Sequence, residues 1–460
     1  MKNSRFRSLI LLFFVGLFIF GLGIFTLRLY QNAFAWVMQP FNKHISGEKY
    51  SSLGDILDRN DVILATSKDG KRQYNDNEMV RKAMIHTVGD NSNQIYTSVQ
   101  NLYRDELCGY NFLLGIKPPS FLKSNKNIKL TLDSKLCVTA LKAMGEKRGA
   151  VAVYNYKTGE VLCMVSTPTY DPNFPPEITD KNKDLYDGIY INRVLSSAYT
   201  PGSVFKLVTS ACGLESMSDI DEKRYTCHRK QAVNGKDITC MGDHGNIGIN
   251  EALMRSCNIY FADLAIELGK DKMMKTANEL GFNKSFTVNR AEIKKSRYDV
   301  SNADDYQLGW SGVGQFEDLL NPMHSLMIMG AIANEGKVVI PNIIADTYVQ
   351  EENPFNLNFM RSESKLIDFM SKETADKLKE MMRNNVQKGY GDSMFPGLSV
   401  HAKTGTAEVG EGKQPHGWMI GFSGDERTPY AFAVIVENSG YGRTQAGPVA
   451  SAVMAEACRI

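Results

Sequence analysis

The sequence predicts an α/β (α+β) fold in which helices flank an antiparallel five-stranded sheet, preceded by a small N-terminal region and a single transmembrane helix. Three observations predict this fold. Two adjacent strand patterns begin near residue 150, three more lie near the C-terminus, and an uncharged apolar run occupies the N-terminus. The stretch between the two groups of strands is mostly helical in its apolar spacing, so helices are available to cover the sheet.

The length and composition set the domain organisation. The chain has 460 residues, of which 43% are hydrophobic, and this length usually corresponds to two or three domains. We expect a short cytoplasmic tail over 1–8, a transmembrane anchor over 9–30, a non-catalytic region over 31–146 and a larger domain over 147–460. The formal net charge is +2, and we find no basic run with interleaved aromatic residues, so nucleic-acid binding is not predicted.

The N-terminal apolar run predicts a membrane anchor. Leu9 to Leu27 contains no charged residue and is about the length that spans a bilayer. Lys2, Arg5 and Arg7 precede it, which favours a cytoplasmic N-terminus and an extracytoplasmic remainder. Ala33-Phe34-Ala35 leaves a cleaved signal peptide open as the alternative, but the apolar run is longer than a usual signal-peptide core. Either way, the rest of the chain is exported.

The first two strands of the sheet are predicted as a hairpin. Ala150–Tyr154 and Glu160–Val165 are rich in β-branched and apolar residues, and Asn155–Gly159 between them has turn composition. Upstream, Ile128–Leu132 alternates like a strand and Ser134–Lys147 has helical spacing. The hairpin therefore begins the larger domain.

The remaining strands and the covering helices come later in the chain. Three strand patterns lie near the C-terminus: Val400–Ala407, Gly417–Phe422 and Tyr430–Glu437. Two stretches carry helical apolar periodicity: Asn250–Leu268 and Pro322–Asn334. In Pro448–Arg459 the proline suits the first turn of a helix that would pack on the sheet.

Three short motifs follow one another in an order that indicates serine acyl-transfer chemistry. They are S-x-x-K at Ser203, S-x-N at Ser256 and K-T-G at Lys403. None is convincing alone, because the same patterns recur elsewhere: S-x-x-K at Ser46, Ser120 and Ser362, and K-T-G at Lys157. Order, spacing and local structure select one set, since the selected serine opens a long apolar run and the selected lysine lies in a strand pattern.

The S-x-x-K motif has a physical rationale. A serine hydroxyl is a poor nucleophile at neutral pH and needs a base. Ser203 and Lys206 are three residues apart, so they share a face of a helix, and apolar residues nearly all round that helix predict its burial. Burial lowers the pKa of a lysine and lets it act as a base. Taken alone, the motif is better explained by a buried helix with a serine cap; together with the other two motifs it favours catalysis.

With these motifs the chain resembles the class B penicillin-binding proteins, the monofunctional peptidoglycan D,D-transpeptidases. Other stretches resemble the family in the expected order: Gly54-Asp55-Ile56-Leu57-Asp58-Arg59-Asn60, Leu64-Ala65, His244-Gly245, Gly312-Val313-Gly314-Gln315, Ala333-Asn334-Glu335-Gly336 and His416-Gly417-Trp418. The resemblance implies the penicillin-binding transpeptidase fold for residues 147–460 and a pedestal-like role for 31–146.

The resemblance also implies roles for the motif residues. Ser203 would be the nucleophile and Lys206 its base. Ser256 would relay a proton between Lys206, Lys403 and the leaving amine. Asn258 would bond to Lys206 and to the peptide chain of the substrate. Lys403 would raise the positive potential.

The K-T-G segment would bind the substrate. The hydroxyls of Thr404 and Thr406 would hold a carboxylate, and Gly405 suits a strand that a ligand approaches closely. The backbone N–H groups of Ser203 and Thr406 would form the oxyanion hole. No cofactor and no metal is implied.

The implied function is cross-linking of peptidoglycan stem peptides, with a D-Ala-D-Ala donor, an amine acceptor and covalent inhibition by penicillin and other β-lactam antibiotics. The implied partner is a membrane glycosyltransferase of the shape, elongation, division and sporulation family. A D,D-carboxypeptidase or a serine β-lactamase would share the first step. A β-lactam sensor and a non-catalytic scaffold fit less well, because the tail before the anchor is short and all three motifs are intact.

The cysteines leave two interpretations open. The chain has eight, and an exported chain permits disulfides. Cys227 and Cys240 flank Asn234-Gly235, a hairpin signal, so a local disulfide is one interpretation. Zinc bound with His228 or His244 is the alternative. Three other cysteines lie in apolar contexts and are expected to be buried small hydrophobes: Cys163, Cys212 and Cys257.

Overall fold

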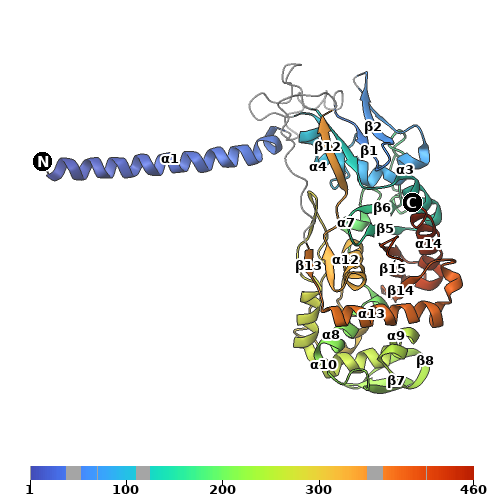
Figure 1. Ribbon diagram of the computed structural model, residues 1–460. Helices are drawn as coiled ribbons and strands as arrows, with labels where there is room; N and C mark the ends of the chain where they lie inside the picture. The colour runs from blue at the N-terminus through green and yellow to red at the C-terminus, as the bar shows by residue number, and fades with distance from the viewer. Residues whose placement is uncertain (1, 38–52, 70, 110–124, 350–365, 411) are drawn as a thin grey trace.

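The computed structural model describes residues 2–37, 53–69, 71–109, 125–349, 366–410 and 412–460. Helix α1 (Lys2–Val37) stands apart from the rest of the fold (Figure 1). Its segment Phe6–Ala33 has a mean hydropathy of 2.7, and the most apolar part of it is not buried, so the segment is long and apolar enough to cross a membrane. This agrees with the anchor predicted over 9–30.

A five-stranded antiparallel sheet forms the centre of the larger domain. The strands are β5 (Gly149–Asn155), β6 (Val161–Thr167), β14 (Val400–Ala407), β15 (His416–Ser423) and β16 (Tyr430–Val436). Their order is β14-β15-β16-β5-β6, so the two groups of strands meet where β16 pairs with β5. All five predicted strands are confirmed. The topology leaves β14 at one edge, where its outer backbone groups are not used by the sheet.

Helices cover both faces of this sheet. α14 (Gly442–Ala457) and α6 (Ser134–Met144) pack together against it, and α12 (Pro322–Ala333) packs against β16, β15 and β5. The prediction that the last helix begins at Pro448 is wrong, because Pro448 lies inside α14. Gly442 and Gly447 are unfavourable in a helix and therefore obscured its true start. A Cβ on Gly442 would come within 2.3 Å of the carbonyl oxygens of Gly405 and Trp418, so the close approach of this helix to the sheet requires glycine.

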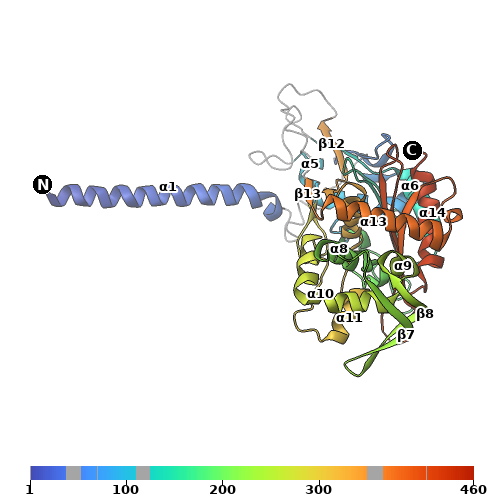
Figure 2. The same ribbon diagram turned by 60° about the horizontal axis from the view of Figure 1, so that its bottom comes forward.

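A helical part with one hairpin lies at the far end from the N-terminal region (Figures 1 and 2). Its elements are α8 (Lys206–Ser216), β7 (Arg224–Val233), β8 (Lys236–Gly248), α9 (Ile249–Arg255), α10 (Asn258–Glu279), α11 (Asp305–Val313) and α13 (Lys372–Asn384). The hairpin turn predicted at Asn234-Gly235 is confirmed, with φ of 48° and 74°. The helix predicted over Asn250–Leu268 is in fact two helices that break at Ser256 and Cys257.

The N-terminal region contains a second five-stranded sheet. Its order is β12-β4-β1-β2-β3, from β12 (Ile344–Val349), β4 (Lys126–Leu130), β1 (Ile56–Leu57), β2 (Ile63–Lys68) and β3 (Lys71–Tyr74). β12 comes from the larger domain and pairs antiparallel with β4. A division of the chain at residue 146 therefore stays a proposal. The sheet of the N-terminal region also includes a strand from residues 344–349, which lie beyond that division.

The shorter elements complete the order. They are α3 (Glu78–Val88), α4 (Val99–Leu102), α5 (Arg104–Leu107), α7 (Arg193–Ser196), η2 (Gly202–Val204), β9 (Thr287–Val288), β10 (Ala291–Glu292), β11 (Lys337–Val339), β13 (Leu366–Asp368), η3 (Asn385–Tyr390) and η4 (Asp392–Met394).

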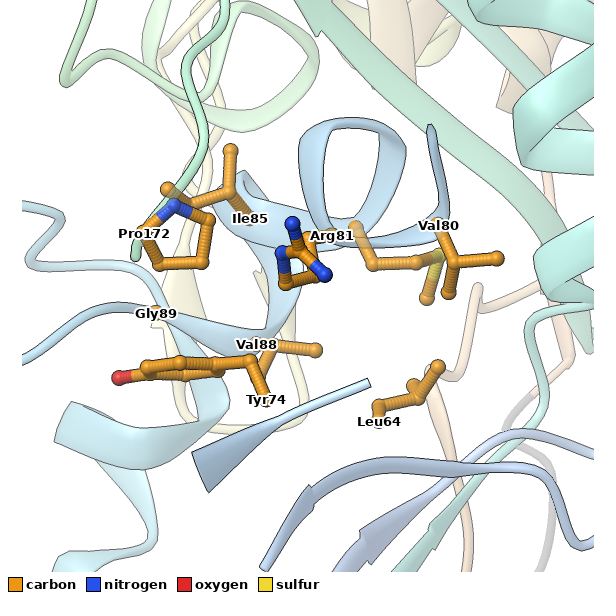
Figure 3. A pocket seen from close by; sticks show the side chains of 9 residues that line it. Leu64, Tyr74, Val80, Arg81, Ile85, Val88, Gly89 and Pro172 are labelled. Carbon is orange, nitrogen blue, oxygen red and sulfur yellow. The ribbon is translucent and has the colours of Figure 1, made fainter. Parts of the chain in front are cut away.

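The N-terminal region is tied to the segment after β6 by buried polar contacts. The guanidinium of Arg81 on α3 donates two hydrogen bonds to the Asp171 carboxylate, at 2.8 and 2.6 Å. Tyr170 donates to Asp90 at 2.7 Å. Figure 3 shows the small apolar pocket at this junction, with Pro172 and Tyr74 at its wall. None of the three motifs lines this pocket, so it is a feature of the junction between the two parts.

Candidate active site

The turn that carries Ser203 is fixed by backbone contacts. Ser203 lies in the 3-10 turn η2, which runs directly into α8 at Lys206. Gly202 has a φ of 56° and donates its N–H to the Gly314 carbonyl at 2.9 Å. A Cβ on Gly202 would lie 2.4 Å from the Thr406 carbonyl oxygen, so only glycine allows this turn to approach the edge strand β14. Ser203 is thereby held beside the K-T-G segment.

The S-x-N motif forms the break between α9 and α10. Ser256 caps α9 in the left-handed conformation, with φ 54° and ψ 42°, which is uncommon for a residue with a side chain. Cys257 is the N-cap of α10, and its sulfur accepts the N–H of Tyr260 at 3.4 Å. Asn258 is the first residue of α10, whereas the prediction placed it inside a helix over Asn250–Leu268. The break turns Ser256 and Asn258 toward α8.

One hydroxyl lies between the two motif lysines. The Ser256 Oγ is 3.1 Å from Lys206 Nζ and 3.1 Å from Lys403 Nζ. Lys206 Nζ also contacts the Ser256 carbonyl oxygen at 2.6 Å and Asn258 Oδ1 at 2.8 Å. Lys403 Nζ donates to the Thr404 carbonyl at 3.0 Å. The structure thus brings Lys206, Ser256, Asn258 and Lys403 into contact, and the Ser203 turn reaches the K-T-G strand through Gly202.

Burial changes the proton affinity of both lysines. Lys206 is 0% exposed and Lys403 is 1% exposed. Burial lowers the pKa of Lys206 to about 7. Burial, followed by repulsion from Lys206, lowers the pKa of Lys403 well below its ordinary value. Within the described ranges neither lysine forms an ion pair with a carboxylate. The two amines together therefore carry less than two positive charges near neutral pH.

Lys206 Nζ has three oxygen neighbours and Lys403 Nζ has two, so hydrogen-bond counting alone does not place the neutral amine; a base at position 206 requires it on Lys206. A neutral amine has two N–H donors and one lone pair. Lys206 can donate to the Ser256 carbonyl and to Asn258 Oδ1, which leaves its lone pair facing the Ser256 hydroxyl. A charged Lys403 then donates to Ser256 Oγ and to the Thr404 carbonyl. In this arrangement Ser256 accepts from one lysine and donates to the other.

The K-T-G segment presents its threonines at the sheet edge. Lys403 and Gly405 are buried, whereas Thr404 and Thr406 are partly exposed on the alternate face. Tyr390 at the end of η3 contacts Thr404 twice: its hydroxyl lies 3.1 Å from Thr404 Oγ1 and accepts the Thr404 N–H at 2.9 Å. The sequence analysis missed Tyr390, because η3 is a π-helical continuation of α13 and no period or motif indicated it.

Of the two interpretations left open, the structure does not contain the disulfide, because Cys227 and Cys240 are free thiols. Strand β7 bulges around His228, which places Cys227 opposite Gly245. The sulfur atoms of Cys227, Cys240 and Cys257 and a ring nitrogen of His244 instead all lie within 4.8 Å of one another. We call these four residues the Cys/His tetrad.

The tetrad has the composition and spacing of a structural zinc site. Cys240 Sγ is 4.0 Å from Cys257 Sγ and 3.6 Å from His244 Nδ1. Tetrahedral zinc with Zn–S bonds of about 2.3 Å separates its sulfur ligands by about 3.8 Å. The hydrogen bond between Cys240 and Cys257 lowers the pKa of Cys240 and raises that of Cys257, so Cys240 is the first of the two to become a metal-binding thiolate. The donors therefore fit Zn²⁺.

The tetrad corrects one further expectation. Cys257 is buried as predicted, but its sulfur faces three potential ligands and is not an inert apolar group. The zinc alternative had named His244 without Cys257. Cys257 was overlooked because it lies inside the S-x-N motif, about one helix away in sequence from the hairpin cysteines.

The chain matches known proteins over most of its length. The family model described as "Penicillin binding protein transpeptidase domain" matches residues 149–455. The chain is 27% identical over 356 residues to the peptidoglycan D,D-transpeptidase PbpA of Mycobacterium tuberculosis, covering 71% of this chain and 72% of that protein. It is 26% identical over 460 residues to stage V sporulation protein D of Bacillus subtilis, covering 90% of this chain and 67% of that protein.

Solved structures share the fold. The crystal structure of PBPA from Mycobacterium tuberculosis superposes with a TM-score of 0.73 at 25% identity, covering 89% of this chain and 100% of that one. The D,D-transpeptidase domain of a peptidoglycan glycosyltransferase from Eggerthella lenta gives 0.75 at 23% identity, covering 89% and 99%. A further PBPA structure, at 0.74 and 24% identity over 89% and 99%, is a ceftriaxone acyl-enzyme complex. The predicted fold is confirmed.

Proposed function

The chain belongs to the penicillin-binding protein transpeptidase family, as a class B member, and from that premise we propose that Ser203 is the nucleophile that cross-links peptidoglycan. The enzyme is a serine-type peptidoglycan D,D-transpeptidase. The observation that carries the assignment of residues is the Ser256 hydroxyl, which lies 3.1 Å from the amines of both Lys206 and Lys403. This arrangement supports a proton relay next to the turn that holds Ser203.

In the acylation step, Ser203 Oγ attacks the carbonyl carbon of the penultimate D-Ala. The hydroxyl proton passes to the neutral Nζ of Lys206, and the carbonyl oxygen becomes an oxyanion bound by the N–H groups of Ser203 and Thr406. The intermediate then collapses: the C–N bond to the terminal D-Ala breaks, and the amine leaves with a proton delivered from Lys206 through Ser256. Lys206 ends the step neutral, as it began.

The second step uses the same groups in reverse. An amine of a neighbouring stem peptide attacks the acyl-enzyme, its proton passes through Ser256 to Lys206, and Ser203 leaves with that proton as a hydroxyl. During acylation, the threonines of the K-T-G segment hold the carboxylate of the terminal D-Ala, which then leaves with the amine, and the charge of Lys403 complements it. A β-lactam carries a similar carboxylate and acylates Ser203 in the same way.

We also propose that the Cys/His tetrad binds Zn²⁺ as a structural metal. Four protein ligands fill a tetrahedral shell and leave no position open to water, so such an ion would supply rigidity. Cys257 joins the tetrad to the turn between Ser256 and Asn258, both of which contact Lys206. The tetrad therefore positions catalytic groups, and no chemical step passes through it.

Helix α1 is proposed to anchor the enzyme with its N-terminus in the cytoplasm and its catalytic domain outside the membrane. The three basic residues before the apolar run support this orientation: Lys2, Arg5 and Arg7. The proposed partner is a membrane glycosyltransferase of the shape, elongation, division and sporulation family, which would supply glycan strands beside the cross-linking domain.

A D,D-carboxypeptidase or β-lactamase is the second candidate, because either shares the acylation step and differs in using water to release the acyl group. The transpeptidase is favoured because neither motif lysine is paired with a carboxylate within the described part of the chain. Rapid release by water needs a base that activates the water, and a carboxylate beside these lysines would be such a base. We expect sustained turnover of a chromogenic cephalosporin to be absent; turnover at tens per second would favour the β-lactamase.

Mass spectrometry of the full-length protein after reaction with labelled penicillin tests the nucleophile. One adduct on Ser203 is expected, and Ser203→Ala should remain folded and unlabelled. An adduct on Ser46, Ser120 or Ser362, all of which lie outside the described residues, would overturn the assignment.

A further inference from the structure

We propose that Tyr390 is a positioning residue that aims the hydroxyl proton of Thr404 at the carboxylate of the substrate. The proposal rests on the proposed function, since it concerns how the same site recognises its ligand. It extends that function because Tyr390 belongs to none of the three motifs. The ligand class is an acyl donor with a free carboxylate next to the bond that breaks.

The first step is the placement of Tyr390. It ends η3, in which α13 widens into a π-helical turn, a rare feature that is enriched at functional sites. The segment is fastened to the edge strand by two bonds: Arg383 donates to the Val400 carbonyl at 3.0 Å, and Asn385 donates to the Ala402 carbonyl at 3.1 Å. Arg443 on α14 donates to the Tyr390 carbonyl at 2.9 Å. The segment that ends at Tyr390 is thus fastened to β14 and to α14.

The second step is the direction of its hydrogen bonds. The phenol oxygen accepts the backbone N–H of Thr404 at 2.9 Å and lies 3.1 Å from Thr404 Oγ1. An accepting phenol retains one proton to donate. If that proton goes to Thr404 Oγ1, the phenol both accepts and donates a hydrogen bond, and the threonine hydroxyl keeps its own proton for a ligand. The reverse direction would leave the phenol proton without a partner among the described contacts.

The third step is the rigidity of Thr404. Its N–H is bound by Tyr390, its carbonyl by Lys403 at 3.0 Å, and its hydroxyl by Tyr390. Burial raises the pKa of Tyr390, so the phenol stays protonated across physiological pH. A carboxylate that reaches Thr404 therefore meets a donor whose orientation is already set, and a preorganised donor binds charge better than a freely rotating one.

Tyr390→Phe tests the proposal, because it removes the hydroxyl and keeps the ring. We would measure the second-order rate of acylation of the full-length protein by a penicillin with a free carboxylate and by its methyl ester. The ratio of the two rates, taken within each variant, cancels any change in the folded fraction. We expect Tyr390→Phe to lower this acid-to-ester ratio by about ten-fold, the scale of one hydrogen bond to a charged group.

Thr404 supplies the matched controls. In a Thr404→Ser background, which keeps the hydroxyl, Tyr390→Phe should still lower the ratio. In a Thr404→Val background it should have no further effect. An unchanged ratio, or an equal loss in the valine background, would overturn the role of Tyr390 while Ser203 is still acylated. If the wild type is not acylated on Ser203 by either compound, the proposed function itself fails.

Discussion

Two Lys-Thr-Gly segments occur in this chain, and their surroundings differ in every respect that matters for catalysis. Lys157-Thr158-Gly159 forms the turn between β5 and β6, where the lysine and threonine are exposed. Lys403-Thr404-Gly405 lies in the edge strand β14, where the lysine is 1% exposed and contacts Ser256. We therefore expect the same three residues to carry chemistry only where burial lowers the pKa of the lysine beside a second lysine.

The glycines differ in what they approach. Gly159 has a φ of 83° and closes a turn, and a Cβ there would lie 2.6 Å from the Ile340 carbonyl oxygen, so this glycine serves the turn and its packing. Gly405 has an extended backbone, and a Cβ there would lie 2.8 Å from the Pro201 carbonyl oxygen. The second glycine thus allows the serine turn to approach the strand. The comparison predicts large effects for changes around β14 and small effects for changes in the turn.

The largest effect is expected for the two buried lysines. Lys206→Ala and Lys403→Ala should each slow acylation by at least about 100-fold, the usual scale for general acid–base groups. Stopped-flow acylation by a penicillin and its methyl ester separates their roles. Lys206→Ala removes the base and should slow both compounds equally, whereas Lys403→Ala should slow the free acid more. A rate near that of the wild type in either variant would contradict the comparison.

The next effect concerns the Cys/His tetrad. Cys257→Ala, or removal of metal by a chelator, should reduce the free energy of unfolding by at least about 2 kcal/mol, because loss of a structural metal is among the larger single effects. Acylation should slow as well, because Ser256 and Asn258 lose their support.

Elemental analysis should find one zinc per chain in the wild type and none in the Cys257→Ala variant. Cys458→Ala is the matched control, because Cys458 is half-buried and outside the tetrad, and it should keep both zinc and stability. If the wild type contained no zinc and a chelator left its stability unchanged, the proposed zinc site at the tetrad would be wrong.

Sequence reasoning found the sheet and the motif residues because both rest on local patterns. The five strands are short apolar runs, and the motif residues have fixed spacings within each motif and a fixed order along the chain. It failed where distant segments converge. The tetrad joins a hairpin to the cap of α10, Tyr390 reaches Thr404 from a π-helical turn, and β12 enters the N-terminal sheet from the larger domain. No period or spacing along the chain encodes these contacts.

A smaller effect is expected from pH. Lys206 has a pKa lowered by burial to about 7, and only its neutral form can accept the proton of Ser203. The acylation rate should therefore rise with pH up to about 7 and level off above it, in rapid-mixing experiments with one penicillin. Because repulsion between two ammonium groups is mutual, Lys403→Ala should shift this rise to higher pH. An unshifted rise would indicate that Lys403 is not charged beside Lys206.

The smallest effect is expected in the turn. Lys157 is exposed, and its amine donates to the Asn334 side chain at 2.8 Å. Exposed polar contacts of this kind contribute between about 0 and 1 kcal/mol, so Lys157→Ala should change the free energy of unfolding by less than about 1 kcal/mol. Acylation should stay within about two-fold of the wild type, because a surface substitution away from the site alters neither burial nor charge there. Urea unfolding and the penicillin acylation rate measure both quantities, with Lys403→Ala as the matched change in the other segment. A loss of acylation in Lys157→Ala approaching that of Lys403→Ala would mean that the motif acts independently of its surroundings, and the contrast between the two segments would be wrong.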